Sequence, residues 1–67
     1  MPRLIALTDV AGNVRLFNPD HIVDVVYVEG LGHTRVYIDV SIEGANYVAV
    51  KETLEQIKIL VNGYRYD

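Results

Sequence analysis

The chain has 67 residues, no cysteine, no tryptophan and a formal net charge of −3. A chain of this length forms a single domain, here residues 1–67, and buries only about 60% of the surface that its unfolded form exposes. The lack of cysteine excludes disulfides and thiolate metal sites, and two histidines are too few for a metal cage. We therefore expect no metal and no cofactor, and association between copies remains as a source of stability.

The composition is typical of an ordered, strand-rich globular protein. Hydrophobic residues make up 51% of the chain, and valine, isoleucine and threonine together supply 20 of the 67 residues. Since no long apolar run occurs in the sequence, we expect neither insertion into a membrane nor a secretory signal. A sequence pI near 5.1 disfavours nucleic acid as a partner. The expected compartment is the cytoplasm of a bacterial cell, with a phage-infected cell included.

Turn residues divide most of the chain into five predicted strands. Glycine, asparagine and proline, which favour turns and interrupt strand pairing, occur near residues 12–13, 18–20, 30–32 and 43–44. The predicted strands cover residues 3–9, 13–17, 22–29, 34–42 and 46–51. The predicted fold class is α+β, mostly β: a five-stranded antiparallel meander or small open barrel with one C-terminal helix.

The last element changes to helical spacing. Apolar residues recur at this spacing from Leu54 to Val61, and Thr53 with Gln56 fits a capping box. Gly63 stands where a glycine commonly ends a helix. The predicted helix covers residues 53–62, and the tail, residues 63–67, either extends a sheet edge or frays.

The third predicted strand suggests self-association. The alternation places Val23, Val25 and Tyr27 on one face and Ile22, Val26 and Val28 on the other, and only Asp24 interrupts these apolar faces. We interpret Asp24 as forming a hydrogen bond or salt bridge across an interface. A domain this small hardly covers both faces, and Ile59 points away from the apolar stripe of the helix. The predicted interface consists of Val23, Val25, Val26, Tyr27, Val28 and Ile59.

The residues give little support to catalysis. There is no cysteine nucleophile or glycine-rich phosphate loop, and Ser41, His21 and His33 have no spacing that suggests a triad. A single chain of this length rarely encloses a pocket of about 300 Å³ or more. The sequence therefore predicts a protein that is not an enzyme and has no catalytic residues.

Binding is better supported, because five tyrosines and four arginines are dense for this length. Tyrosine supplies rigid contact area, and arginine stacks on rings and grips phosphate or carboxylate groups. The predicted ligand-binding residues are Arg35, Tyr37, Tyr47, Arg15 and His33. A small anionic ligand suits them better than a long polyanion. The alternative is that these residues only form cross-strand pairs and interface contacts.

Three segments resemble the FlbD family of very small bacterial and phage proteins. They are NPDHI at residues 18–22, TRVYI at 34–38 and YVAVKETLEQI at 47–57, and the resemblance covers roughly residues 4–61. The sequence departs from the family pattern at residues 30–33 and 41–45. The resemblance implies a non-catalytic accessory of the flagellar motor, with no active site to carry over.

These observations lead to one main hypothesis and three alternatives. The main hypothesis is a small non-catalytic homo-oligomeric binding protein that binds a partner or a small anionic ligand at sites between subunits. One alternative is a phage-encoded anti-defence sponge that sequesters a nucleotide immune signal, and another is a FlbD-like flagellar accessory that contacts other proteins. The remote alternative is an RNA binder resembling CsrA, which also has five strands and a helix, but the acidity disfavours it.

Overall fold

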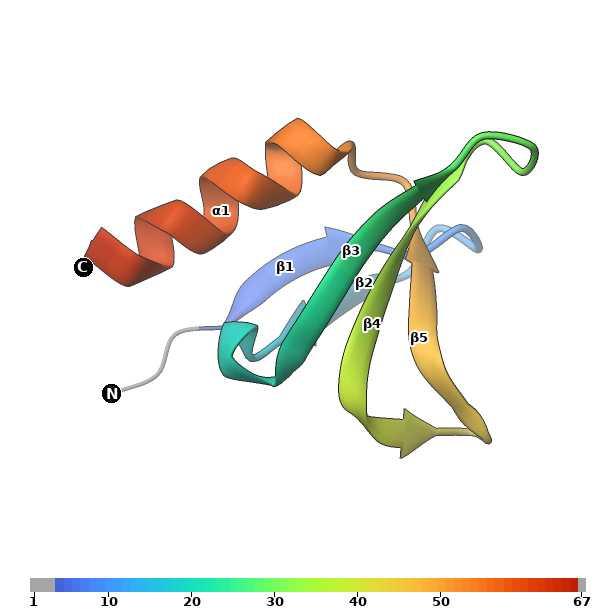
Figure 1. Cartoon of the computed structure of the whole chain (residues 1–67), viewed down its shortest axis with the longest axis horizontal. Coiled ribbons are helices and arrows are strands. Elements are labelled where there is room, and N and C mark those ends of the chain that lie inside the picture. The colour runs from blue at the N-terminus through green and yellow to red at the C-terminus, as the bar shows by residue number, and fades with distance from the viewer. Residues whose placement is uncertain (1–3, 67) are drawn as a thin grey trace.

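The chain forms five strands and one C-terminal helix, as the predicted fold class requires (Figure 1). The computed structural model describes residues 4–66, and the side chains of residues 4–63. The elements are β1 (Ile5–Thr8), β2 (Val14–Phe17), the 3₁₀ turn η1 (Pro19–His21), β3 (Ile22–Val28), β4 (His33–Ile42), β5 (Ala45–Val50) and α1 (Leu54–Tyr66). All strand pairs are antiparallel. Arg3, where the first predicted strand begins, and Asp67 lie outside the described residues.

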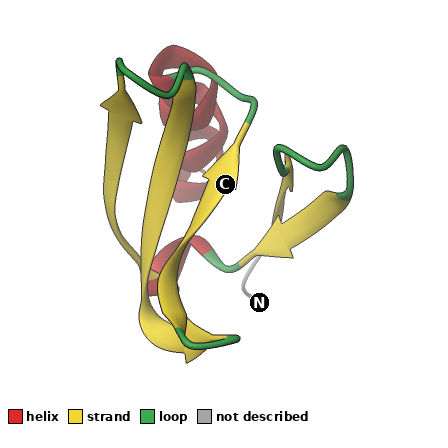
Figure 2. Ribbon diagram, turned by 90° about the vertical axis from the view of Figure 1, so that its right-hand side faces the viewer, coloured by secondary structure: helices red, strands yellow, loops and turns green. Residues whose placement is uncertain are grey.

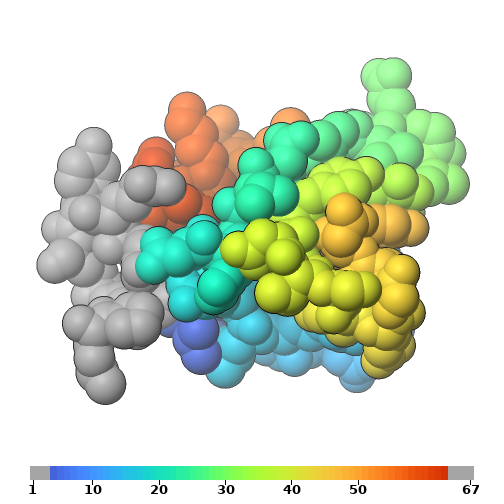
Figure 3. All heavy atoms as spheres, turned by 60° about the horizontal axis from the view of Figure 1, so that its bottom comes forward, coloured from blue at the N-terminus to red at the C-terminus, as the bar shows by residue number. Residues whose placement is uncertain are grey.

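The strands form two sheets that meet at one end. One sheet is the β1–β2 hairpin, and the other has the order β3-β4-β5 (Figure 2). An isolated bridge joins Asp9 to Val50, and the Lys51 amide donates a 2.8 Å hydrogen bond to the Thr8 carbonyl. Atoms of the hairpin and of β5 accordingly lie against each other in Figure 3. Strands β1 and β5 are joined at their ends by these bonds, whereas β2 and β3 each have a hydrogen-bonded neighbour on one side only.

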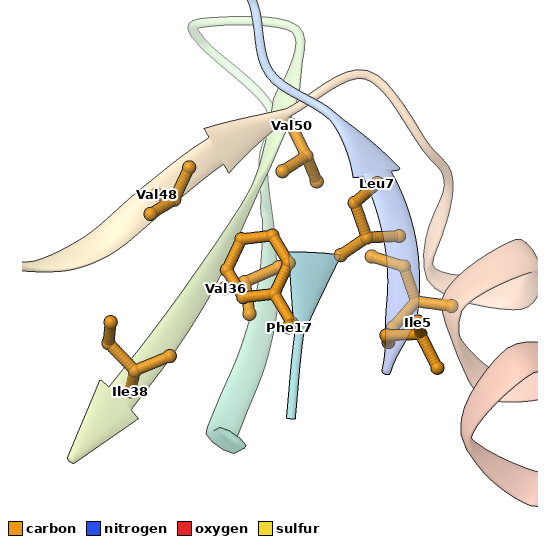
Figure 4. Packing of buried hydrophobic residues seen from close by; sticks show 8 residues of the cluster. Ile5, Leu7, Phe17, Val36, Ile38, Val48 and Val50 are labelled. Atoms are coloured by element: carbon orange, nitrogen blue, oxygen red, sulfur yellow. The ribbon is translucent and has the colours of Figure 1, made fainter. Parts of the chain in front are cut away.

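The core lies between the two sheets and beneath the helix. Leu7 of β1, Val36 of β4 and Val50 of β5 are completely buried. Phe17 places its ring among side chains of both sheets (Figure 4). From α1, Ile57 is buried and Val61 packs against the cluster. The other buried apolar residues are Ile5, Ile38 and Val48.

Strand β3 contains an irregularity that the sequence analysis missed. Its register against β4 shifts between Ile22 and Asp24, so Ile22 faces Ile38 and Val25 faces Val36. Both Ile22 and Val25 pack against the core. The expectation that they lie on opposite faces is therefore wrong, because an extra residue in a bulge reverses the alternation that follows it.

The N-terminus of α1 has the predicted capping box. The Gln56 amide donates to the Thr53 hydroxyl at 3.1 Å, and the Thr53 amide donates to the Gln56 side-chain oxygen at 2.9 Å. The predicted end of the helix is wrong, because α1 continues through Gly63 to Tyr66. An interior glycine costs a helix only about 1 kcal/mol relative to alanine, which is too little to end it. The tail extends the helix rather than a sheet edge.

Replacing Thr53 by alanine removes the side-chain acceptor of the capping box. We expect Thr53→Ala to lower the free energy of unfolding by about 1 kcal/mol. Urea denaturation followed by circular dichroism measures this change. Thr53→Ser is the matched control because it keeps the hydroxyl acceptor. Equal midpoints for the alanine variant and the wild type would show that the capping box adds no stability.

Candidate functional site

The outer face of the three-stranded sheet brings together three of the predicted ligand-binding residues. Along β4, the buried residues Thr34, Val36 and Ile38 alternate with half-buried Arg35 and Tyr37. The pairing of β4 with β5 places Tyr37 opposite Tyr47. Because opposite residues of an antiparallel pair share a face, Tyr47 stands beside Tyr37 on the side away from the core.

The three side chains contact one another and form what we call the shelf: Arg35, Tyr37 and Tyr47. The Cζ atom of Arg35 lies 4.5 Å from the centroid of the Tyr47 ring, which is cation–π distance. The Tyr37 and Tyr47 rings are 5.5 Å apart between centroids and inclined by 46°. These contacts hold a guanidinium group against the Tyr47 ring, with the Tyr37 ring beside it, on a half-buried surface.

The charge of Arg35 is not neutralised by a carboxylate in the described part of the chain. Hydrogen bonding to Tyr37 raises the pKa of the Arg35 guanidinium, so the group keeps its charge. Its Nε atom is buried and has no hydrogen-bond partner among the described residues. Buried polar atoms in folded proteins are usually hydrogen-bonded, so an unpaired one needs an explanation.

His33 extends the shelf toward the β3–β4 turn. It is the first residue of β4 and lies opposite Val28 of β3. Since His33, Arg35 and Tyr37 are two residues apart along one strand, they share the outer face. The Nε2 atom of His33 is also buried without a partner in the described chain.

The structure places Arg15 apart from the other four candidates. It belongs to β2, opposite Leu7 of the hairpin, and its Nε donates to Asp9 at 2.9 Å. The other carboxylate oxygen of Asp9 accepts hydrogen bonds from the amides of Ala11 and Asn13 at 3.0 and 2.9 Å. Arg15 therefore has a structural role in the β1–β2 turn.

The predicted interface residues divide between two surfaces. On the β3 side, Val23, Val26 and Tyr27 are exposed, whereas Val25 and Val28 are half-buried. Ile59 instead lines a hollow of about 310 Å³ between α1 and β1, together with Ala6 and Leu60. Ile59 and the predicted residues of β3 therefore belong to two separate surfaces, and their role in an interface stays a prediction.

Two surface features were missed by the sequence analysis. A groove of about 420 Å³ lies between β3 and α1. On the hairpin, Val14 and Leu16 are 68% and 63% exposed, which makes its outer face apolar. The alternation of these two residues with Arg15 and buried Phe17 was the available signal for the hairpin surface. The groove had no signal, because it depends on where the helix packs.

The chain matches no protein-family model, no curated protein sequence and no solved structure. The resemblance to the FlbD family therefore stays a prediction. Within residues 4–66, no helix is long and apolar enough to cross a membrane.

The Asp9 carboxylate predicts a pH dependence of stability. Hydrogen bonds from the Asn13 amide and from Arg15 lower the pKa of Asp9 below its usual value. A lowered folded-state pKa stabilises the protein above the unfolded pKa, near 3.9, and this stability is lost as the pH falls through the folded value. We expect Asp9→Asn to unfold at lower urea than the wild type at neutral pH, with the difference shrinking below about pH 4. A difference that stays constant down to the acid limit would contradict this role.

Proposed function

We propose that the chain is a non-catalytic, homo-oligomeric binding protein that holds a small anionic ligand on the shelf. The observation that carries the proposal is the Arg35 guanidinium, which lies 4.5 Å from the Tyr47 ring centroid on a half-buried surface. No carboxylate among the described residues pairs with this group. The positive charge is thus held in place and remains available to a ligand.

The neighbours of Arg35 favour a ligand that has a flat apolar part as well as a negative charge. Arg35 lies opposite Ala49 on one side and Val26 on the other. These side chains are short and uncharged, so they leave apolar surface beside the guanidinium. Guanidinium groups bind phosphate through paired N–H donors, and aromatic rings stack on planar groups. A nucleotide combines a planar base with phosphate and therefore fits this class.

Charge argues for a small ligand rather than a nucleic acid. The protein has a formal net charge of −3, and polyanion binding requires several cations that contact successive phosphates. Sequestration of a nucleotide needs only affinity, with no reaction at the site. The proposed role is therefore that of a protein that withdraws such a ligand from solution.

The proposal predicts a thermal shift with a ligand of the right class. Cyclic nucleotides and ADP-ribose are suitable probes, tested one at a time by thermal unfolding. A ligand present at 100 times its Kd stabilises the folded state by about 2.7 kcal/mol. For a domain of this size, that corresponds to a rise in Tm of roughly 10 °C or more. The absence of a shift with every probe at millimolar concentration would remove nucleotides as the ligand class.

Variants of the shelf then locate the site. Arg35→Ala and Tyr37→Ala are expected to abolish the shift, and Arg35→Lys to reduce it, because lysine keeps the charge but lacks the planar donor group. Arg15→Ala is the charge-matched control, since it also removes one arginine but lies on β2. It is expected to lower the Tm without ligand and leave the shift intact. A shift that survives Arg35→Ala would place the ligand elsewhere.

A further inference from the structure

Strand β3 presents an open edge with few of the features that normally prevent strand pairing. It is seven residues long and pairs only with β4. Its bulge and its one charged residue, Asp24, lie near its start, and residues 25–28 contain no charge, proline or bulge. Of the other strands, β2 has four residues and includes Arg15, and β5 is hydrogen-bonded to the hairpin at its C-terminal end. Exposed edges of this kind pair readily with another strand unless they are short, charged or covered. The longer and less protected edge is therefore β3.

An apolar groove runs beside this edge. Val23 and Val25 line it from β3, and Leu54 and Val61 line it from α1. Val23 is 64% exposed, and Leu54 is 44% exposed. A strand added at the edge of β3 would direct alternate side chains toward the core side of the sheet, where this groove lies. The groove and the open edge therefore suit the same occupant.

The groove also contains one negative and one positive side chain. Asp24 of β3 and Lys58 of α1 both line it. Neither forms an ion pair with another side chain in the described part of the chain. Asp24 does accept a 2.9 Å hydrogen bond from the Val25 amide. A two-fold axis pairs a residue i with j and also j with i, so a second copy offers both charges a partner.

We propose that two copies of the chain associate by pairing their β3 strands antiparallel, with each β3 seated in the β3–α1 groove of the other copy. Asp24 of each copy then faces Lys58 of the second copy. The product is a continuous six-stranded sheet, β5-β4-β3 followed by β3-β4-β5. Antiparallel pairing about a two-fold axis perpendicular to the sheet keeps both outer faces on the same side.

This dimer bears on the ligand site, a consequence that rests on the proposed function. Val26 lies opposite Arg35 in the β3–β4 ladder, so the Val26 residues of the two copies stand between the two shelves. The two shelves accordingly lie on one continuous face of the six-stranded sheet.

The mass in solution tests the dimer directly. Light scattering at micromolar concentration is expected to give twice the chain mass of 7.5 kDa for the wild type. Val23→Lys places a charge at the β3 edge and is expected to give the monomer mass. Val14→Lys is the matched control, because Val14 has a similar exposure, 68% against 64%, but belongs to β2. Neither residue is part of the core, so circular dichroism should show both variants folded.

Each other outcome of this comparison overturns the proposal. A wild-type protein with the monomer mass would contradict the dimer, and a strand from another protein would then be the alternative occupant of the groove. Dissociation by Val14→Lys would place the contact on the outer face of the hairpin. Arg35→Ala is expected to keep the dimer mass, so loss of ligand binding and loss of association are separate results.

Charge reversal tests the pairing of Asp24 with Lys58. Lys58→Glu alone sets two negative charges against each other and is expected to weaken the dimer, measured as a higher dissociation constant by sedimentation. The double variant Asp24→Lys with Lys58→Glu restores opposite charges and is expected to recover part of the lost affinity. Failure of the double variant to recover any affinity would contradict this pairing.

Discussion

The contact between the β1–β2 hairpin and the three-stranded sheet is the constraint on which the fold depends. Leu7, Val36 and Val50 are completely enclosed there, and Phe17 fills the space between the sheets. Within residues 4–66, the backbone hydrogen bonds between the two sheets lie near Asp9 and Val50. A core this thin hides few side chains, because a short chain has a large surface for its volume. Much of its apolar surface must therefore remain outside.

The location of the exposed apolar surface follows from the course of the strands. Strand β4 lies at the centre of its sheet and alternates from His33 to Ile38, so one face of this part packs in the core while Arg35 and Tyr37 face outward. Strand β3 lies at an edge, where the bulge leaves Val23 outside the packing. The central strand thus carries the shelf, and the edge strand carries the proposed contact surface. The proposed ligand site and the proposed dimer contact both lie on surfaces of the sheet that the core positions but does not bury.

The sequence was most informative where one local pattern decided the outcome. The alternation along residues 34–38 was sufficient to identify the buried face of β4, and the Thr53–Gln56 capping box was sufficient to place the start of α1. The ends of the five predicted strands fall within two residues of the observed ones. The grouping of Arg35, Tyr37 and Tyr47 also followed from alternation together with the hairpin that joins β4 to β5.

The errors arose where packing or long-range pairing decided the outcome. No local pattern marks the bulge near Asp24, which depends on how β3 pairs with β4. The helix was predicted to end before Gly63, but glycine costs a helix only about 1 kcal/mol relative to alanine, and α1 continues through it. Arg15 was grouped with Arg35 by residue type, although its partner Asp9 lies at the turn of the other sheet.

The central claim is that the β3 edge is a working surface covered by a second copy of the chain. Amide hydrogen exchange of β3 and β2, measured over a range of protein concentrations, tests it most directly, because amides exchange slowly when they are hydrogen-bonded in a stable strand pair. If two copies pair through β3, protection of the β3 amides from exchange increases with protein concentration, while protection of the β2 amides stays constant. Amides of β3 that exchange equally fast at every concentration would contradict it.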